Sequence, residues 1–329
     1  MSTDSPSERQ RPINRYIPKA SALAYGCMEL GGPNHEPITA DVVRQANQCI
    51  DAALESGINF FDHADVYRMG QAEEAFGQAL AQRPALRDDI VLQSKCSIKF
   101  DDELAPGRYD ASYDWIIRSV EGSLKRLKTD FLDVLILHRP DPLMEPEEVV
   151  KAFDILYQQG KVKYFGMSNV HGHQMAFLQH YLPHPLVANQ IEMGLGSLDW
   201  LNEGVTVGHP EYQEANFTAG TLEYCRMNHV QIQSWRSLAQ GLYSGRDVSG
   251  ESESVQKTAR LVSLLAEKYQ CTREAIVLGF ILRHPAKIQP VIGTTNLQRI
   301  KACADAVNVT LSREDWYGLY VSARGVRLP

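Results

Sequence analysis

Apolar and polar positions follow two distinct patterns along this chain. Short, nearly continuous apolar runs are typical of strands buried on both faces, and stretches with an apolar residue every three or four positions are typical of amphipathic helices. The predicted strands cover residues 22–26, 59–64, 90–96, 133–138, 164–169, 186–192, 231–235 and 290–293. The predicted helices cover residues 39–56, 71–81, 112–127, 146–159, 172–179, 218–228, 255–269, 273–282, 297–306 and 312–323.

This order of elements predicts a single closed barrel. Eight strand–helix units follow one another, and eight parallel strands are the number that closes a TIM barrel. The predicted fold class is therefore α/β, a single (β/α)8 TIM barrel with an extra C-terminal helix at residues 312–323. No linker rich in Pro, Gly or Ser divides the chain, so we expect a polar N-terminal tail at residues 1–19 and one domain at residues 20–329.

Composition narrows the class of partner. With 33 Lys and Arg against 40 Asp and Glu the net charge is −7, which argues against a nucleic-acid binder. No apolar run is long enough to span a bilayer, and residues 1–19 lack the apolar core of a signal peptide. The six cysteines include no Cys-x-x-Cys pair, as expected for reduced thiols. We therefore expect a cytoplasmic protein that binds small molecules and neither nucleic acid nor membrane.

Polar residues gather where the predicted strands end. In a TIM barrel the catalytic groups come from the C-terminal ends of the strands, so these positions predict the active site. They include Asp62-His63, Ser94-Lys95, His138-Arg139, Ser168-Asn169, Gln190, Trp235-Arg236-Ser237 and Gly293-Thr294-Thr295. A lysine inside an apolar run costs several kcal/mol to bury unless a partner compensates its charge, so we expect Lys95 to have one.

Asp62, Tyr67, Lys95 and His138 together predict a site that protonates a carbonyl oxygen. A tyrosine with a pKa of about 10 is a poor acid at neutral pH unless its phenolate is stabilised. An ammonium at about 4 Å supplies roughly 4 kcal/mol at an effective dielectric constant of about 20, equivalent to nearly three pKa units. We therefore expect Lys95 to bring the pKa of Tyr67 into a working range, and Asp62 to hold Lys95 charged. His138, as a neutral imidazole, suits the task of orienting the carbonyl.

Five segments resemble the aldo-keto reductase family in order and in context. They are Gly26-Cys27-Met28-Glu29-Leu30-Gly31, residues 59–67 ending in Asp65-Val66-Tyr67, Ser94-Lys95-Cys96, residues 135–141 with His138-Arg139-Pro140-Asp141, and residues 160–169 ending in Ser168-Asn169. The resemblance runs from about residue 22 to residue 306 and is greatest to a bacterial branch of NADPH-dependent oxidoreductases.

This resemblance implies an NADPH-dependent oxidoreductase that reduces aldehydes or ketones to alcohols by hydride transfer. Tyr67 matches the family's proton donor, and Lys95 matches the residue that modulates its pKa. Asp62 matches the partner of that lysine, and His138 matches the group that orients the carbonyl. The implied cofactor is NADP(H), and the implied partner is a small-molecule carbonyl substrate.

The resemblance also implies where the cofactor binds. Ser168, Asn169 and Gln190 match the positions that hydrogen-bond the nicotinamide carboxamide, and Trp235 matches an aromatic residue stacked on the ring. The remaining matches are Arg236, Ser237 and Leu238 over the pyrophosphate, and Gly293, Thr294, Thr295 and Arg299 at the adenosine 2′-phosphate. Taken residue by residue, simpler interpretations stay open: Ser168-Asn169 as a helix cap, Trp235 as core packing and Arg299 as a solvated helix charge.

Three departures bear on the cofactor. Trp235-Arg236-Ser237-Leu238 replaces a common aromatic-Ser-Pro-Leu, Gly293 replaces a basic residue that is frequent in the family, and Cys303 replaces an asparagine that often contacts adenine. These departures weaken the preference for NADPH over NADH without reversing it, because Arg299 remains.

Two other function classes compete with a reductase. The first is a redox-sensing or regulatory subunit that binds NADPH with little turnover, and the complete set of four catalytic residues argues against it. The second is a metal-dependent hydrolase that uses His63, Asp65 and His138. It requires a His-x-His in the first strand, where Ala24-Tyr25-Gly26 stands, so we expect no metal site.

Substrate specificity is expected from long loops over the mouth of the barrel, at residues 97–111 and 193–217 and in the C-terminal segment. Met28, Met69, Tyr109 and Trp200 are candidates to line the mouth, which favours apolar or aromatic carbonyls. Arg139 either binds a carboxylate or pairs with Asp141, and the residues alone leave both open. We expect a monomer or a weak homo-oligomer.

Overall fold

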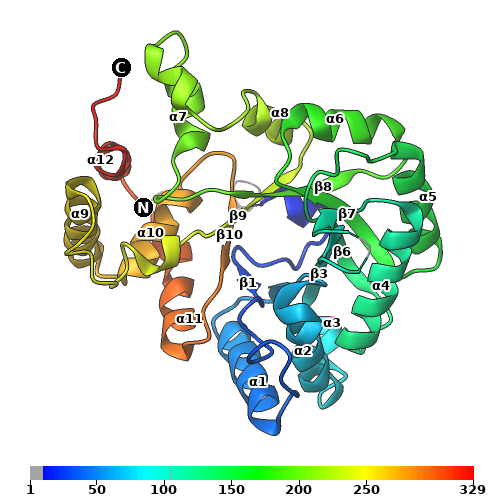
Figure 1. The fold of residues 1–329 in the computed structure, drawn as a ribbon. Coiled ribbons are helices and arrows are strands. Elements are labelled where there is room, and N and C mark those ends of the chain that lie inside the picture. Colours follow the sequence, from blue (N-terminus) through cyan, green and yellow to red (C-terminus); the bar gives the residue numbers. More distant parts are fainter. Residues whose placement is uncertain (1–9, 104) are drawn as a thin grey trace.

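The computed structural model describes residues 10–103 and 105–329, and its centre is a closed barrel of parallel strands (Figure 1). Around the barrel the strands follow the order β1-β10-β9-β8-β7-β6-β3-β2. Their bounds are β1 Ala24–Gly26, β2 Phe60–Asp62, β3 Val91–Cys96, β6 Leu132–Leu137, β7 Val162–Ser168, β8 Leu186–Glu192, β9 Gln231–Trp235 and β10 Gln289–Ile292. The predicted single (β/α)8 barrel is confirmed.

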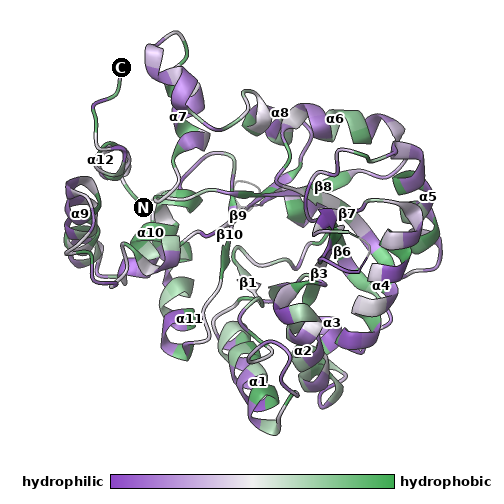
Figure 2. Ribbon diagram, viewed as in Figure 1, coloured by the Kyte–Doolittle hydropathy of each residue, from purple (hydrophilic) through white to green (hydrophobic). Residues whose placement is uncertain are grey.

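Helices form a ring around the outside of the barrel (Figure 1). They carry polar and apolar residues together (Figure 2), and in α1 the apolar residues Val43, Ala46 and Ile50 are buried. The bounds are α1 Ala40–Glu55, α2 Gln71–Ala81, α3 Leu86–Asp89, α4 Tyr113–Leu127, α5 Pro146–Gln158, α6 Gly172–Tyr181, α7 Asp199–Val205, α8 Thr221–Met227, α9 Glu253–Tyr269, α10 Arg273–Leu282, α11 Leu297–Ala304 and α12 Arg313–Arg324. In the part of the chain that the structure describes, no helix is both long and apolar enough to cross a membrane.

The extra C-terminal helix, α12, packs beside α9 at the edge of the molecule (Figure 1). The hydroxyls of Thr258 in α9 and Ser322 in α12 share a hydrogen bond of 2.8 Å, and Lys268 pairs with Asp315 at 2.7 Å. This helix was predicted from the sequence, and it packs on α9 rather than directly on the strands of the barrel.

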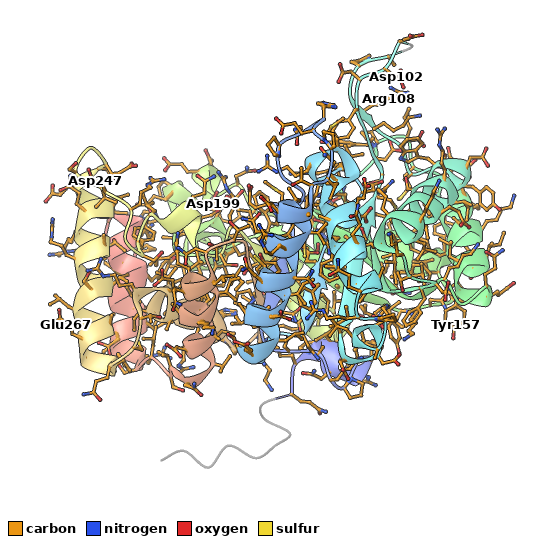
Figure 3. The ribbon with its side chains drawn as sticks, turned by 90° about the horizontal axis from the view of Figure 1, so that it is seen from below. Asp102, Arg108, Tyr157, Asp199, Asp247 and Glu267 are labelled. Carbon is orange, nitrogen blue, oxygen red and sulfur yellow. The ribbon has the colours of Figure 1, made fainter. Side chains whose placement is uncertain are left out.

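Two loops that we expected to lack regular structure contain short elements. Residues 97–111 form a small hairpin, β4 Ile98–Lys99 and β5 Arg108–Tyr109, and the Asp102 and Arg108 side chains of its tip stand out from the barrel in Figure 3. Residues 193–217 contain α7, whose Trp200 is buried against Phe280. Trp200 was expected to line the substrate mouth; its ring is nearly fully buried, and it also borders a cavity of about 480 Å³ that is described below.

The N-terminal segment closes the base of the barrel. A 3-10 helix, η1 Pro12–Arg15, places Ile13 in contact with the inward-facing residues Phe60, Val91 and Val134, and Ile13 is fully buried. Residues 10–19 of the predicted tail therefore pack with the barrel, and the predicted boundary at residue 20 does not coincide with a boundary in packing. Residues 1–9 of that tail lie outside the described residues.

Strand register explains why polar residues share one level of the barrel interior. Side chains of a strand alternate between its two faces, so residues two apart point the same way. Asp62 is in register with Gln93 across β2 and β3, and Lys95 follows Gln93 two residues later. On the other side of the barrel Gln233 is in register with both Gln190 and Gln289. The register therefore places Gln93 level with Asp62 and the other three glutamines level with one another, and Lys95 lies one step further toward the strand ends.

Candidate active site

Lys95 lies at the centre of the site and is fully buried. Its Nζ donates hydrogen bonds to a carboxylate oxygen of Asp62 at 2.8 Å, to the carbonyl oxygen of His63 at 2.9 Å and to the phenolic oxygen of Tyr67 at 2.9 Å. An ammonium has three N–H donors, so all three are used. The predicted partner of the buried lysine is Asp62, and the predicted contact between Lys95 and Tyr67 is present.

Tyr67 reaches Lys95 because the chain turns sharply after β2. Its backbone N–H donates to Ala64, and Asp65 N–H donates to the carbonyl of Lys95 at 3.0 Å, which ties the turn to β3. Arg68 and Met69 then take positive φ values of 51° and 57° before α2 begins. Such a conformation is uncommon outside glycine, and here it re-aims the chain so that the Tyr67 ring lies over the end of the barrel.

His138 follows β6 and faces the Tyr67 ring. The two ring centroids are 5.9 Å apart in an edge-to-face arrangement. The backbone N–H of His138 donates to Cys96 at 2.8 Å, which fixes its height beside Lys95. Its buried Nδ1 has no hydrogen-bond partner among residues 10–103 and 105–329. The ring is therefore held by packing and by its backbone, beside the phenol of Tyr67.

Burial and charge set the protonation states of these groups. Burial lowers the pKa of His138, and the charges of Lys95 and Arg139 lower it further, so the imidazole is neutral at pH 7. Burial alone would lower the pKa of Lys95, but the charges of Asp62 and Tyr67 raise it above its usual value. The lysine therefore stays an ammonium despite its complete burial, as predicted.

The predicted lowering of the Tyr67 pKa is wrong in direction. Burial raises the pKa of Tyr67, the Lys95 charge offsets only part of this rise, and Asp62 adds to it. The expectation counted the Lys95 charge but omitted the burial of the phenol, which is the larger effect, and Asp62 raises the pKa of Tyr67 further. The phenol therefore keeps its proton at neutral pH. Lys95 lowers the free energy of forming the phenolate, but it does not ionise the phenol.

A layer of glutamine side chains continues from Asp62 across the barrel. Gln93 Nε2 donates to Asp62 Oδ1 at 2.5 Å and to Gln233 Oε1 at 2.9 Å. Gln190 Nε2 donates to the same Gln233 oxygen at 3.1 Å, and Gln233 Nε2 donates to Gln289 at 2.9 Å. Gln93, Gln233 and Gln289 are fully buried. We did not predict these three glutamines as part of the site, although Gln93 and Gln233 lie within predicted strands.

The residues predicted to hold the nicotinamide lie together, and some of their polar groups already form hydrogen bonds with one another. Asn169 Nδ2 donates to the His138 carbonyl at 3.1 Å, and Asn169 Oδ1 accepts from Trp235 Nε1 at 3.0 Å. Ser168 Oγ donates to the Gln190 carbonyl at 2.8 Å. The side chain that accepts hydrogen bonds from the N-terminal turn of α6 is His171, so the helix-cap interpretation of Ser168-Asn169 is wrong.

One cavity of about 660 Å³ collects nearly all of the predicted site. Lys95 lies beneath its lining, and Thr295 is also outside it. The lining includes Asp62, Tyr67, His138, Ser168, Asn169, Gln190, Trp235, Arg236, Ser237, Leu238, Gly293, Thr294 and Arg299. Lining residues that we missed include Glu29, Gln240, Gly241, Val291 and Ile292, which are ordinary loop or strand residues without a chemical signature. Of the residues expected at the substrate mouth, Met28 lines the cavity, whereas Met69 and Tyr109 do not.

The end of the cavity at β10 and α11 carries the groups expected for a phosphate. Arg299 lies at the start of α11, where its guanidinium contacts Glu274 and Ser244 at 3.3 Å each. Thr294 precedes the helix, and a Cβ added to Gly241 would come within 3.3 Å of the Arg299 guanidinium. Backbone N–H groups at a helix N-terminus, hydroxyls and a guanidinium together favour an anion.

The donor set fits a nicotinamide dinucleotide. Because Gln190 Nε2 donates to Gln233, Gln190 Oε1 is left to accept a hydrogen bond from an amide such as the carboxamide. Trp235 supplies an aromatic ring on the cavity wall, and Arg299 supplies a cation at the far end. Within the described residues no group of three or more His, Cys, Asp or Glu is placed to hold a metal ion.

Comparisons with known proteins agree on one family. The sequence model of the aldo/keto reductase family matches residues 22–319. The chain is 34% identical to an uncharacterized oxidoreductase, YcsN, of Bacillus subtilis, covering 94% of this chain and 96% of the relative. It is 36% identical to a 6-dehydroglucose reductase of Agrobacterium fabrum, covering 93% and 95%. Among solved structures, aldo-keto reductase AKR11C1 of Bacillus halodurans superposes with a TM-score of 0.71 at 25% identity, covering 92% of each chain.

Proposed function

The chain belongs to the aldo/keto reductase family, and from this premise we propose that it reduces aldehydes or ketones with NADPH, using Tyr67 as the proton donor. Its family and its oxidoreductase relatives make it an oxidoreductase that reduces carbonyl groups. The observation that carries the finer proposal is the buried ammonium of Lys95, which bonds both to Asp62 and to the phenol of Tyr67.

In this proposal each residue has one task. A bound reduced nicotinamide supplies the hydride that forms the new C–H bond at the carbonyl carbon. Tyr67 gives its proton to the carbonyl oxygen, which becomes the alcohol, and solvent later returns a proton to Tyr67. Lys95 stabilises the phenolate while the proton is away, and Asp62 keeps Lys95 charged. His138 is a neutral imidazole that donates an N–H to the carbonyl oxygen and so orients it.

The cofactor half of the proposal rests on groups around the same cavity. Gln190 offers a free amide oxygen for the carboxamide, and Trp235 offers a ring for stacking. Ser168 and Asn169 would complete the contacts to the carboxamide, and Arg236, Ser237 and Leu238 would hold the pyrophosphate. Gly293, Thr294, Thr295 and Arg299 hold the 2′-phosphate, whose charge favours NADPH over NADH.

A carbonyl panel assayed with NADPH and with NADH tests the proposal by the loss of nicotinamide absorbance. We expect turnover with NADPH at lower KM than with NADH. Tyr67→Phe should lower kcat by about a thousandfold, since positioned acid catalysis contributes roughly 10²–10⁴-fold, while the Kd for NADPH stays within about twofold. Turnover retained in Tyr67→Phe would contradict the assignment. The presence of all four catalytic side chains favours this reading over a redox-sensing subunit, which would bind NADPH tightly and turn over slowly.

A further inference from the structure

Three guanidinium groups line the cavity, and they differ in whether a carboxylate already neutralises them. Arg236 pairs with Glu192 at 3.2 Å, and Arg299 pairs with Glu274 at 3.3 Å. The side chain of Arg139 has neither an ion pair nor a hydrogen bond with any of the residues that the structure describes, and its one ring contact is with Trp235. Arg139 is therefore the guanidinium of this cavity that no carboxylate among the described residues neutralises.

The nearest candidate partner in sequence, Asp141, is engaged elsewhere. One of its carboxylate oxygens accepts from the backbone N–H of Ala111 at 2.8 Å, and the other accepts from Leu143 N–H at 2.9 Å. The alternative that Arg139 pairs with Asp141 is therefore wrong. The reason is local: each carboxylate oxygen of Asp141 already accepts a hydrogen bond from a nearby backbone N–H group.

The position of Arg139 separates it from the cofactor phosphates of the proposed function. Arg139 follows His138 at the end of β6, and its backbone lies within 3.5 Å of the Ser97 hydroxyl on both its N–H and its carbonyl side. In the barrel, β6 and β10 are separated by three strands in either direction, so they lie opposite each other. Thr294 and Arg299 follow β10, which leaves Arg139 on the side of Tyr67 and His138.

The guanidinium also sits in an environment that strengthens anion binding. It lies 6.0 Å from the centroid of the Trp235 ring and is half-buried, and its charge is felt by the His138 imidazole. A planar guanidinium presents paired N–H donors that match a carboxylate or phosphate, and partial removal from water makes such a pair stronger.

A second cavity meets the first at Arg139, Asn169 and Trp235. It has a volume of about 480 Å³ and is lined mainly by polar side chains, His171, Gln174, Glu192, Ser197, Asp199, Asn216 and Thr218 among them. It offers room for the polar remainder of a substrate whose carbonyl lies at Tyr67. Of the four residues expected to favour apolar or aromatic carbonyls, Met28 lines the first cavity and Trp200 borders the second, whereas Met69 and Tyr109 line neither.

We propose that Arg139 binds an oxyanion of the substrate, so that the preferred substrates are carbonyl compounds carrying a carboxylate or a phosphate. This inference rests on the proposed reductase function. The carbonyl oxygen lies at Tyr67 and His138, the oxyanion lies at Arg139, and the remainder extends into the second cavity. Arg139 acts as a specificity residue and takes no part in hydride or proton transfer.

Matched substrates test this proposal directly. One pair is 4-carboxybenzaldehyde and its uncharged counterpart methyl 4-formylbenzoate, and the other is glyceraldehyde 3-phosphate and glyceraldehyde. We expect the wild type to prefer at least one anionic member by about tenfold or more in kcat/KM, equivalent to about 1.4 kcal/mol. Arg139→Gln should abolish this preference, mainly through KM for the anion, and Arg139→Lys should restore part of it.

Arg108→Gln is the matched control, because it removes one guanidinium from the hairpin at the same end of the barrel, outside both cavities. It should keep the wild-type preference. A wild type without any preference for the anionic members, or an Arg139→Gln variant that keeps one, overturns the inference while leaving the reductase intact. Failure of every carbonyl compound to oxidise NADPH would instead overturn the proposed function.

Discussion

Two layers of the barrel interior are equally buried but opposite in chemistry. The layer at the base consists mainly of apolar side chains such as Phe60, Val91 and Val134, closed from below by Ile13. The layer above it contains charged and amide side chains, among them Asp62 and Gln93, and Lys95 lies one step further along β3. Adjacent layers differ by two residues along each strand, or roughly 6.6 Å at the usual rise. Two residues along the same strands therefore separate the apolar layer that stabilises the fold from the polar layer at the proposed active site.

The two layers differ in the free energy of burying their side chains. Burying apolar groups is favourable, whereas a buried charge or amide must find partners to offset the loss of water. The upper layer meets this demand with side-chain hydrogen bonds that run from Lys95 through Asp62 and Gln93 to Gln233. We expect changes in the upper layer to alter catalysis and changes in the lower layer to alter stability alone.

The largest effect is expected from Lys95→Met. Turnover should fall by about a thousandfold, within the range attributed to positioned acid–base groups. The free energy of unfolding should fall by about 3–5 kcal/mol, because Asp62 is left as an uncompensated buried charge. NADPH oxidation and urea denaturation measure the two effects. The double variant Asp62→Asn/Lys95→Met should recover much of the stability and none of the turnover; a double variant with restored turnover would show that the pair is structural only.

Ile13→Ala tests the lower layer. Ile13 is fully buried against the base of the barrel, so its truncation should cost about 2–5 kcal/mol of unfolding free energy. The kcat should stay within about twofold of the wild type, because the substitution lies a full layer below the catalytic groups. Thermal unfolding and steady-state kinetics provide the measurements, and a large loss of kcat at preserved stability would break the separation between layers.

Two buried glutamines of β9 sharpen the comparison, since they are two residues apart in different layers. Gln233 bonds to Gln93, Gln190 and Gln289, whereas Gln231 bonds to backbone groups of Ile232 and Lys287. Gln233→Leu should lower kcat/KM by about tenfold, equivalent to about 1.4 kcal/mol, because Gln93 and Gln190 each lose an acceptor.

Gln231→Leu is the control for this experiment. Both variants leave buried polar groups unpaired and should lose about 1–3 kcal/mol of stability, but the Gln231 variant should keep its kcat/KM within about twofold. Equal kinetic losses in both variants would mean that the amide layer acts only through stability.

The smallest effect is a pH dependence on the outer face of β2. His63 follows Asp62, packs its ring 4.6 Å from Phe76, and burial lowers its pKa to about 3. The unfolded chain takes up this proton near pH 6.5, so between pH 6.5 and 3 the unfolded state binds more protons and stability falls with pH. His63→Leu should reduce the loss between pH 6.5 and 5.5 by about 1 kcal/mol, measured by urea denaturation at each pH. If the free energy of unfolding depends on pH in the same way in His63→Leu as in the wild type, His63 is not the titrating group.

The fold and the clustering of Asp62, Tyr67, Lys95 and His138 could be predicted because both depend on local patterns. Apolar runs and helical spacing fixed the order of the barrel elements, and the strand ends placed Asp62, Lys95 and His138 on one face. Other features depend on contacts distant in sequence. Trp200 is buried because α7 packs on Phe280. Arg139 has no ion pair among the described residues, because the Asp141 carboxylate accepts from two backbone N–H groups instead. These outcomes require coordinates, since nothing in the residue types distinguishes them.

The pKa of the Tyr67 phenol in the presence and absence of the Lys95 ammonium tests the central claim most directly. Tyrosine labelled with ¹³C at Cζ reports ionisation by NMR, and Tyr67→Phe assigns the resonance. Burial raises this pKa and Lys95 opposes the rise, so the phenol should ionise at least about one pH unit lower in the wild type than in Lys95→Met. Ionisation at the same pH in both proteins, or at a lower pH in Lys95→Met, would contradict the account.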